Sequence, residues 1–178
     1  MMRIVITGSV GTGKTSIARI LSKKLMVPLV ELSDAVKDIP FVYNERLRTK
    51  EVEIKDLEKW AKGKIRNRES YIVEGHLASE IRIKSDFVFV LRAHPEEIRK
   101  RLQKRKYHKE KIIENMMAEA LDYCSAVLGK RKNLFEIDTT GKTASQSAGE
   151  IIRILKGKAK PKAISWSSWL RDSLCPGK

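Results

Sequence analysis

The residues best suited to chemistry form a glycine-rich motif near the start of the sequence. Residues 8–15 (GSVGTGKT) match the pattern G-x-x-x-x-G-K-[ST] at every position. In this pattern the backbone N–H groups of the loop and of the following helix point at bound phosphates, and the helix dipole favours their negative charge. Gly11 and Gly13 permit the crowded backbone that this convergence requires. The sequence therefore predicts a binding loop for a nucleoside triphosphate.

Three side chains at the end of this loop have separate predicted roles. Lys14 supplies a positive charge to the β- and γ-phosphate oxygens, and the hydroxyl group of Thr15 is a ligand for Mg²⁺. Ser16 adds a hydroxyl group near the α-phosphate. We expect all three residues to bind the nucleotide and its metal ion.

A magnesium site of this kind also needs a carboxylate at the end of a neighbouring strand. Glu74, after the apolar run 70–73 (SYIV), is the first candidate, and Asp86, before the run 87–91 (FVFVL), is the second. His76 follows Glu74 by two positions. A histidine at a strand end is commonly an ordinary polar residue, but beside a metal site it can orient or deprotonate a water molecule.

A strongly basic run occupies residues 99–107 (RKRLQKRKY). Six of these nine residues carry positive charge, and Tyr107 adds an aromatic ring. Phosphoryl transfer needs mobile guanidinium groups to neutralise the charge on three transferring oxygens. We interpret the run as part of a lid over the nucleotide, at about residues 99–109. The alternative is a solvated basic face of a helix.

The loop motif alone is shared by GTPases, ATPase motors, nucleotide kinases and small-molecule kinases. No N-K-x-D guanine signature occurs in the sequence, and 178 residues are fewer than a motor core usually has. Arginines from a closing lid are the usual supply of positive charge in nucleotide kinases. The basic run therefore favours that class.

Short apolar runs alternate with helical patterns along the chain. Strands separated by helices predict an α/β fold of the P-loop type, with a parallel sheet of about five strands and helices on both faces. The charged helix at 45–65 is expected to be exposed and mobile. The expected strands are residues 3–7, 29–32, 70–73, 87–91 and 134–137, and the expected helices are residues 14–25, 45–65, 110–128 and 148–155, with another beginning at Pro95.

The composition restricts the class of protein. Hydrophobic residues make up 42% of the chain, and no apolar run approaches the roughly 20 residues that a membrane-spanning helix needs. We expect one soluble, cytoplasmic domain over residues 1–155, without a membrane partner. Cys124 and Cys175 match no metal-ligand spacing and are expected to be reduced, one in a buried helix and one in the tail.

Positive charge dominates the chain and its last residues. The net charge of +15 favours polyanionic partners such as nucleotides, RNA or ribosomal surfaces, and the alternative is a solvated lysine-rich surface. Residues 156–162 (KGKAKPK) cannot build a core, so a basic flexible tail is expected over residues 156–178. Trp166 and Trp169 in this tail either pack onto the domain or bind a partner such as RNA.

The sequence resembles the adenylate kinase isoenzyme 6 family, which comprises small archaeal and nuclear adenylate kinases with ATPase activity that act in maturation of the small ribosomal subunit. The resemblance extends from about residue 4 to residue 137. It rests on the loop at 8–16, residues 74–76 (EGH), residues 88–92 (VFVLR), residues 101–107 with Arg101, Leu102, Arg105 and Tyr107, and the pattern K-[IL]-x-x-N-x-x-x-E at 111–119.

This resemblance implies an enzyme that transfers the γ-phosphoryl group of ATP to AMP, giving two ADP, and that hydrolyses ATP more slowly. It also implies a small-subunit ribosomal protein or rRNA as a partner. Residues at about 32–56 would correspond to the AMP-binding region, where Ser33 and Asp34 match. The resemblance assigns ATP binding to Gly11, Gly13, Lys14, Thr15 and Ser16, the magnesium-binding acid to Glu74, the histidine linked to catalysis to His76, and the lid arginine on ATP to Arg105.

The chain departs from the family pattern at two of these positions. Glu74 stands where the family usually has an aspartate, so its carboxylate reaches one methylene further. Lys106 stands between Arg105 and Tyr107 where the family commonly has glycine, which predicts a less flexible lid. The alternative function is a regulatory ATPase that remodels a ribosomal protein–RNA complex and has little AMP kinase activity.

Overall fold

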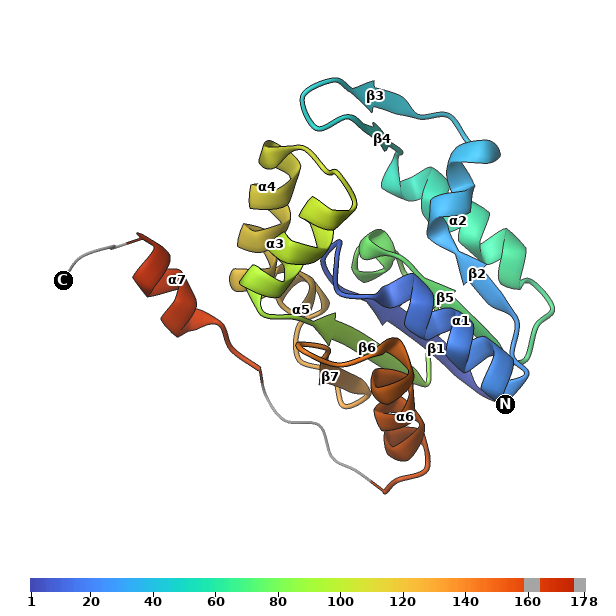
Figure 1. The fold of residues 1–178 in the computed structure, drawn as a ribbon. Helices are drawn as coiled ribbons and strands as arrows, with labels where there is room; N and C mark the ends of the chain where they lie inside the picture. Colours follow the sequence, from blue (N-terminus) through green and yellow to red (C-terminus); the bar gives the residue numbers. More distant parts are fainter. Residues whose placement is uncertain (159–163, 175–178) are drawn as a thin grey trace.

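The computed structural model describes residues 1–158 and 164–174, and these residues form a parallel sheet between layers of helices (Figure 1). The sheet contains β1 (Arg3–Thr7), β2 (Leu29–Glu31), β5 (Tyr71–Glu74), β6 (Phe87–Arg92) and β7 (Leu134–Asp138). Its strand order is β2-β5-β1-β6-β7, and all neighbouring strands pair in parallel. The predicted α/β fold with a five-stranded parallel sheet is confirmed.

Helices connect the strands, and a small hairpin projects beyond them. The hairpin consists of β3 (Val42–Asn44) and β4 (Thr49–Glu51). Two short 3-10 helices, η1 (Leu32–Lys37) and η2 (His76–Ser79), follow β2 and β5. The α-helices are α1 (Lys14–Leu25), α2 (Ile54–Ile65), α3 (Pro95–Lys104), α4 (Lys109–Ala120), α5 (Tyr123–Leu128), α6 (Ala144–Leu155) and α7 (Ser167–Leu174).

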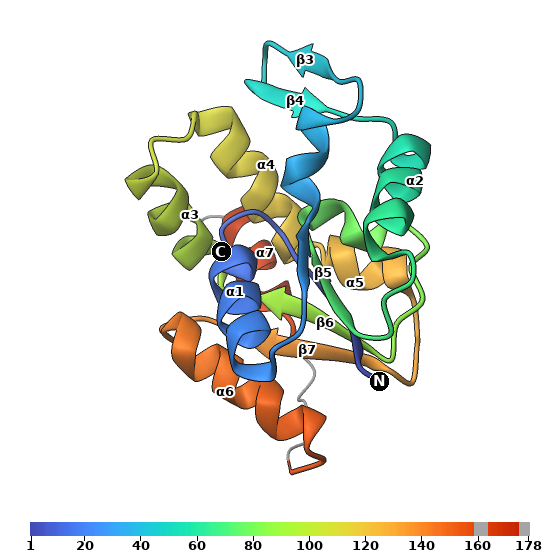
Figure 2. The same ribbon diagram turned by 90° about the vertical axis from the view of Figure 1, so that its right-hand side faces the viewer.

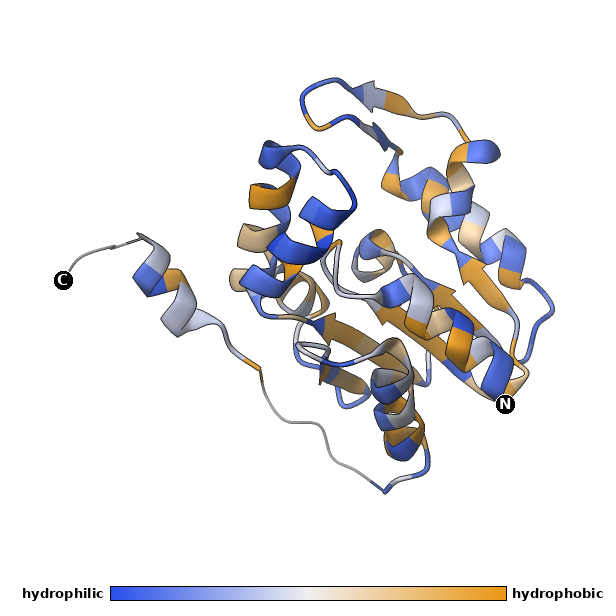
Figure 3. Cartoon of the chain, viewed as in Figure 1, coloured by the Kyte–Doolittle hydropathy of each residue, from blue (hydrophilic) through white to orange (hydrophobic). Residues whose placement is uncertain are grey.

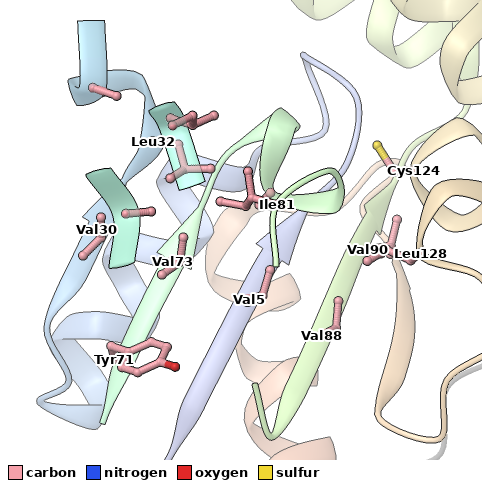
Figure 4. Packing of buried hydrophobic residues seen from close by; sticks show 14 residues of the cluster. Val5, Val30, Leu32, Tyr71, Val73, Ile81, Val88, Val90, Cys124 and Leu128 are labelled. Carbon is pink, nitrogen blue, oxygen red and sulfur yellow. The ribbon is translucent and has the colours of Figure 1, made fainter. Parts of the chain in front are cut away.

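Side chains on each strand alternate between two apolar clusters. In β1, Ile4 and Ile6 belong to the cluster that packs against α1 and α6, whereas Val5 belongs to the cluster that packs against α2 and α5. Figure 2 shows α1 and α6 on one side of the sheet and α2 and α5 on the other. Figure 4 shows the second cluster, in which Val5 and Val88 from neighbouring strands lie on one face of the sheet. Because both faces are covered, the strands read as continuous apolar runs rather than alternating ones. Figure 3 shows the strands of the sheet mostly in hydrophobic colours, whereas the surrounding helices carry both hydrophilic and hydrophobic residues.

The segment 45–65 is not one exposed helix, and that prediction was wrong. Its first residues form the turn and second strand of the β3–β4 hairpin. The side chain of Asn44 accepts a hydrogen bond from the N–H of Leu47 at 3.0 Å, and Arg48 takes a left-handed conformation with φ 47°. These local contacts close the turn in place of a helix. The following helix, α2, is anchored to the core because Leu57 is buried.

The apolar stripe at 110–128 predicts one helix, whereas the structure has two, α4 and α5. The break falls at Asp122, which has φ 55° and whose carboxylate accepts a hydrogen bond from the guanidinium group of Arg92. Arg92 is 30 residues away in the sequence, so a pattern of nearby residues does not reveal this contact of Asp122. The break is therefore a tertiary effect.

The last described residues form a helix that contacts the domain. Residues 156–178 were predicted as a flexible tail, with two alternatives for the tryptophans; within it, residues 167–174 are α7, and Trp169 packs against the apolar cluster of α3 and α4. Residues 159–163 and 175–178, including Cys175, lie outside the described residues. Cys124 is a buried free thiol in α5. Within residues 1–158 and 164–174, no helix has the length and apolar character to cross a bilayer.

Candidate active site

A cleft with a volume of about 540 Å³ opens beside the glycine-rich loop, where β1 and β5 end. The carboxyl ends of parallel strands are the edge at which α/β proteins bind ligands. The cleft brings together eight of the residues assigned to the site from the sequence. These are Gly11, Gly13, Lys14, Thr15, Ser16, Glu74, His76 and Arg105.

The loop at residues 8–15 owes its shape to its first glycine. Gly8 has φ 138°, and a Cβ atom there would lie 2.3 Å from the carbonyl oxygen of Leu91 in β6. Any side chain would therefore force the loop away from the sheet. The loop leads directly into α1, which begins at Lys14, so the free N–H groups of the first helical turn face the cleft.

Lys14 lies in the loop's interior, with only 8% of its surface exposed. Its ammonium group donates a hydrogen bond to the carbonyl oxygen of Ser9 at 2.9 Å. Burial lowers the pKa of Lys14, and the nearby carboxylate of Glu74 opposes this shift. An anion that binds at the loop would favour the charged ammonium group further, so phosphate binding and protonation of Lys14 support each other.

Thr15 and Glu74 lie together at the proposed metal site. Strand pairing places Glu74 opposite Ile6, at the end of β1, and the hydroxyl group of Thr15 donates a hydrogen bond to its Oε1 at 3.1 Å. Glu74 is 2% exposed, and burial raises the pKa of its carboxyl group against the opposing effects of Lys14 and Thr15. A hydroxyl group and a carboxylate, completed by phosphate oxygens and water, form a donor set that fits Mg²⁺.

This metal site depends on the nucleotide for its remaining ligands. No group of three or more His, Cys, Asp or Glu side chains that could hold a metal ion occurs in the part of the chain that the structure describes. Mg²⁺ is usually held by one or two protein groups together with substrate phosphates. Thr15 and Glu74 therefore suit a metal ion that arrives with the nucleotide.

Asp86, the second candidate for the magnesium site, lies at the opposite edge of the sheet, and that alternative was wrong. Its carboxylate accepts hydrogen bonds from the backbone N–H of Arg3 at 2.9 Å and from the guanidinium Nε at 3.1 Å. The physical reason is direction: Asp86 precedes β6, whereas Glu74 ends β5. In a parallel sheet these positions lie at opposite edges.

His76 lies in the cleft two residues beyond Glu74, and its backbone is held in place. Its carbonyl oxygen accepts a hydrogen bond from the hydroxyl group of Thr7 at 3.2 Å. Desolvation and the cations of Lys14 and Lys111 lower the pKa of His76 to about 4. His76 is exposed to solvent, which limits the desolvation, but even the ordinary pKa of about 6.5 leaves the imidazole mostly neutral above pH 7.

The arginines of the basic run have different surroundings. Arg99 forms an ion pair with Glu96. Arg101 pairs with Glu97 and donates hydrogen bonds to the carbonyl oxygens of Gly11 and of Thr139, at 3.1 and 2.8 Å. It therefore supports the loop rather than extending from a lid.

Arg105 is the arginine of this run that faces the cleft. It is exposed, lines the cleft, and forms no ion pair with any described residue. Its positive charge also contributes to the lowered pKa of Lys14, which places the guanidinium group near the loop. Arg105 is therefore free to meet an anion.

Two side chains of α4 bind the loop, and the sequence analysis names them only as part of the family pattern. The Asn115 side-chain oxygen accepts a hydrogen bond from the N–H of Val10 at 3.1 Å, and Glu119 Oε2 accepts one from the hydroxyl group of Ser9 at 2.9 Å. Asn115 and Glu119 are four residues apart, so they lie on one face of the helix. Two polar residues at this spacing within an apolar stripe could have indicated from the sequence that this face of the helix binds polar groups.

The segment 32–56 forms the wall of the cleft opposite the loop. Ser33 lines the cleft, but Asp34 does not, and its carboxylate pairs with the ammonium group of Lys37. Asp34 therefore matches the family pattern but does not line the cleft. The other lining residues of this segment are Leu32, Val36, Tyr43, Arg48, Thr49, Lys50 and Val52.

Comparison with known proteins shows the family. The family model described as AAA domain matches residues 4–122. The chain is 34% identical over 177 residues to a Methanocaldococcus jannaschii protein named "Putative adenylate kinase", with 97% of each chain covered. It is 38% identical over 175 residues to a Pyrococcus furiosus protein of the same name, covering 93% of this chain and 92% of that one. The chain belongs to the family of these archaeal proteins.

Solved structures of similar fold come from other kinases. Shikimate kinase from Aquifex aeolicus superposes with a TM-score of 0.54 at 16% identity, over 88% of this chain and 97% of that one. A gluconokinase from Sinorhizobium meliloti superposes with a TM-score of 0.55 at 12% identity, over 88% and 94%. The fold is that of the P-loop kinases related to nucleoside monophosphate kinases.

Proposed function

We propose that this member of the archaeal family is an adenylate kinase, which transfers the γ-phosphoryl group of ATP to AMP and releases two ADP. The observation that carries the proposal is the convergence of Lys14, Thr15 and Glu74 in one cleft with Arg105. The names of the archaeal relatives support AMP as the acceptor.

The proposed donor site binds the triphosphate of ATP through the loop. Backbone N–H groups of the loop and of α1 surround the phosphates, and Lys14 neutralises the β- and γ-oxygens. Thr15 and Glu74 would hold Mg²⁺, which would neutralise part of the negative charge on the phosphates. The transition state of phosphoryl transfer is loose, so the contribution of these residues is position and charge rather than covalent chemistry.

Arg105 and His76 act on the transferring group in this proposal. Arg105 has no ion pair to break within the described residues, so its guanidinium group can turn toward the γ-phosphoryl oxygens without losing a partner. His76 is neutral above pH 7 and can therefore accept a hydrogen bond from a water molecule in the cleft. Such a water molecule would account for slow ATP hydrolysis when no acceptor is bound.

The proposed AMP site is the wall formed by η1 and the β3–β4 hairpin. Arg48 and Lys50 line the cleft there and supply positive charge for a monophosphate, while Tyr43 and Val36 supply apolar surface for a base. This wall faces the loop across one continuous cleft. Donor and acceptor phosphates can therefore meet between Lys14 and Arg48.

The proposal is tested by measuring ADP formation from ATP with AMP, CMP, GMP or UMP as the acceptor, with and without Mg²⁺. We expect turnover to require Mg²⁺ and to be much faster with AMP than with the other acceptors. Magnesium-dependent ATP hydrolysis that no monophosphate accelerates would contradict the kinase function.

The second candidate is a regulatory ATPase that acts on a complex of a small-subunit ribosomal protein with rRNA. The net charge of +15 favours it, because a surface of this charge attracts polyanions. Under this alternative, rRNA would stimulate ATP hydrolysis more than AMP stimulates ADP formation. The same assay with added rRNA separates the two candidates.

A further inference from the structure

The buried carboxylate of Glu119 connects the phosphate-binding loop with the C-terminal segment, residues 164–174. On one side, Glu119 Oε2 accepts the hydrogen bond from the hydroxyl group of Ser9 at 2.9 Å. On the other side, Glu119 Oε1 accepts hydrogen bonds from Arg92 Nε at 2.6 Å, the N–H of Ala93 at 3.2 Å and the indole N–H of Trp166 at 3.1 Å. Both oxygens are thus occupied, and the residue is 2% exposed.

Arg92 makes this connection rigid. Its guanidinium group, 1% exposed, also donates to Glu136 Oε1 at 2.7 Å and to the carboxylate of Asp122. The C-terminal segment reaches this same cluster a second time, because the N–H of Ile164 donates to Glu136 Oε2 at 3.1 Å. Removing one partner from a buried charge cluster leaves an uncompensated charge, so these groups must keep their positions together.

An apolar contact runs parallel to the polar one. Val10 of the loop and Trp169 of α7 both pack against the cluster that includes Ile98 and Leu102. A Cβ atom at Gly11 would lie 3.3 Å from Ile98, so this cluster also touches the loop's backbone. The C-terminal segment and the loop therefore share both a carboxylate and a packing surface.

Ser9 is the point at which these contacts reach the phosphates. Its hydroxyl group is held by Glu119, and its carbonyl oxygen accepts the hydrogen bond from Lys14 Nζ at 2.9 Å. A shift of Ser9 would therefore displace the acceptor that positions the Lys14 ammonium group. No contact between Trp166 and the cleft is needed for Trp166 to influence the nucleotide.

We propose that the C-terminal segment sets the position of the phosphate-binding loop through Glu119, with Trp166 and Glu119 as positioning residues for nucleotide binding. The proposal rests on the proposed function only in taking ATP as the ligand of the loop. The segment then forms part of the kinase's working structure rather than a separate appendage.

The test compares Trp166→Phe with Trp169→Phe in the full-length chain, by titration with Mg–ATP. Trp166→Phe keeps an aromatic ring and removes the N–H that binds Glu119, so we expect affinity for ATP about fivefold weaker, which corresponds to the net contribution of one ordinary hydrogen bond. Trp169→Phe is the matched control, because its indole N–H makes no hydrogen bond to a described residue. We expect its affinity to stay within about twofold of the wild type.

Ser9→Ala separates a positioning role from a general loss of stability. This substitution cuts the connection between Glu119 and the loop, so Trp166→Phe should cause no further loss of affinity in the Ser9→Ala background. Wild-type affinity of the Trp166→Phe variant, or equal losses in both backgrounds, would overturn the proposal. Failure of the wild-type chain to bind ATP would instead contradict the proposed function.

Discussion

At the scale of single residues, the site contains buried ionisable side chains, whose charged forms are disfavoured by burial unless a group of opposite charge lies nearby. Lys14 and Glu74 are both nearly inaccessible, and burial shifts their pKa values in opposite directions, each against the influence of the other. Perturbed ionisable groups gathered in a cleft are typical of functional sites. Bound Mg–ATP would partner both groups, because its phosphates are anions that would lie near Lys14 and its metal ion is a cation that would lie near Glu74.

Replacing Lys14 by alanine is expected to lower kcat/KM for ATP by at least about 100-fold, or about 2.7 kcal/mol in barrier height, because the phosphates lose their buried positive charge. The fold should persist, because the side chain belongs to neither apolar cluster. Lys23→Ala, at an exposed position on the same helix, is the control. A loss of less than about tenfold for Lys14→Ala, about 1.4 kcal/mol, would remove this residue from its assigned role.

Replacing His76 by alanine is expected to reduce ATP hydrolysis by about 10- to 100-fold while changing ATP affinity less than about threefold, since the ring would act on water rather than on the triphosphate. Turnover and nucleotide titration are measured on the same variant. His108→Ala is the control, because His108 does not line the cleft. Equal changes in affinity and turnover, or no change in either, would show that His76 is an ordinary polar residue.

At the scale of elements, the strands and the loop can be predicted from the sequence because each has a pattern within a few consecutive residues. The apolar runs of β1 and β6 and the pattern of residues 8–15 need no distant partner to be recognised. The break at Asp122 and the loop contact of Glu119 depend on Arg92 and Ser9, which are far away in sequence. Asn44, whose side chain binds the turn, was a local indication of the hairpin, but the many charged residues at 45–65 favoured the prediction of an exposed helix.

The Arg3–Asp86 pair fixes the far edge of the sheet, and its effect on stability should depend on pH. The Arg3 guanidinium holds the pKa of Asp86 below its usual value. A carboxyl group with a lowered folded-state pKa stabilises the fold above its unfolded pKa, about 3.9, and this contribution is lost as the pH falls through the folded-state pKa. Asp86→Asn is therefore expected to lower the thermal midpoint at pH 7, with a difference that shrinks below about pH 4.

Phosphoryl transfer at neutral pH is the second measurement on the Asp86→Asn variant. Because Asp86 lies at the edge away from the cleft, we expect kcat and the dependence on Mg²⁺ to match the wild type. Loss of magnesium-dependent turnover would return Asp86 to the metal site. A stability difference that stays constant down to about pH 2 would show that the ion pair contributes nothing.

Lys106 has φ 59°, a left-handed conformation, and it stands where the family that the sequence resembles commonly has glycine. A left-handed conformation costs a residue with a side chain about 1–2 kcal/mol, whereas glycine adopts it freely but loses more entropy on folding. Lys106→Gly is therefore expected to change the free energy of unfolding by no more than about 1 kcal/mol, in contrast to most substitutions by glycine. Urea unfolding measures it, and destabilisation beyond about 2 kcal/mol would show that the Lys106 side chain makes a contact of its own.

At the scale of the whole molecule, the loop, the acid that ends β5 and the basic turn after α3 lie at one edge of the sheet. The sequence predicts this convergence because parallel strands end at a common edge. The partner of Trp166 could not be predicted, because Glu119 lies 47 residues away in the sequence. For residues 164–174, the alternative in which the tryptophans pack onto the domain agrees with the structure.

The central claim is that the cleft passes a phosphoryl group to AMP. The most direct measurement uses ATP labelled in its γ-phosphate together with Mg²⁺ and AMP, and follows the label. We predict that label appears in ADP at a rate that rises with AMP concentration and exceeds the release of labelled inorganic phosphate. Label that appears only in inorganic phosphate, at a rate independent of AMP, would contradict the kinase account and leave an ATPase.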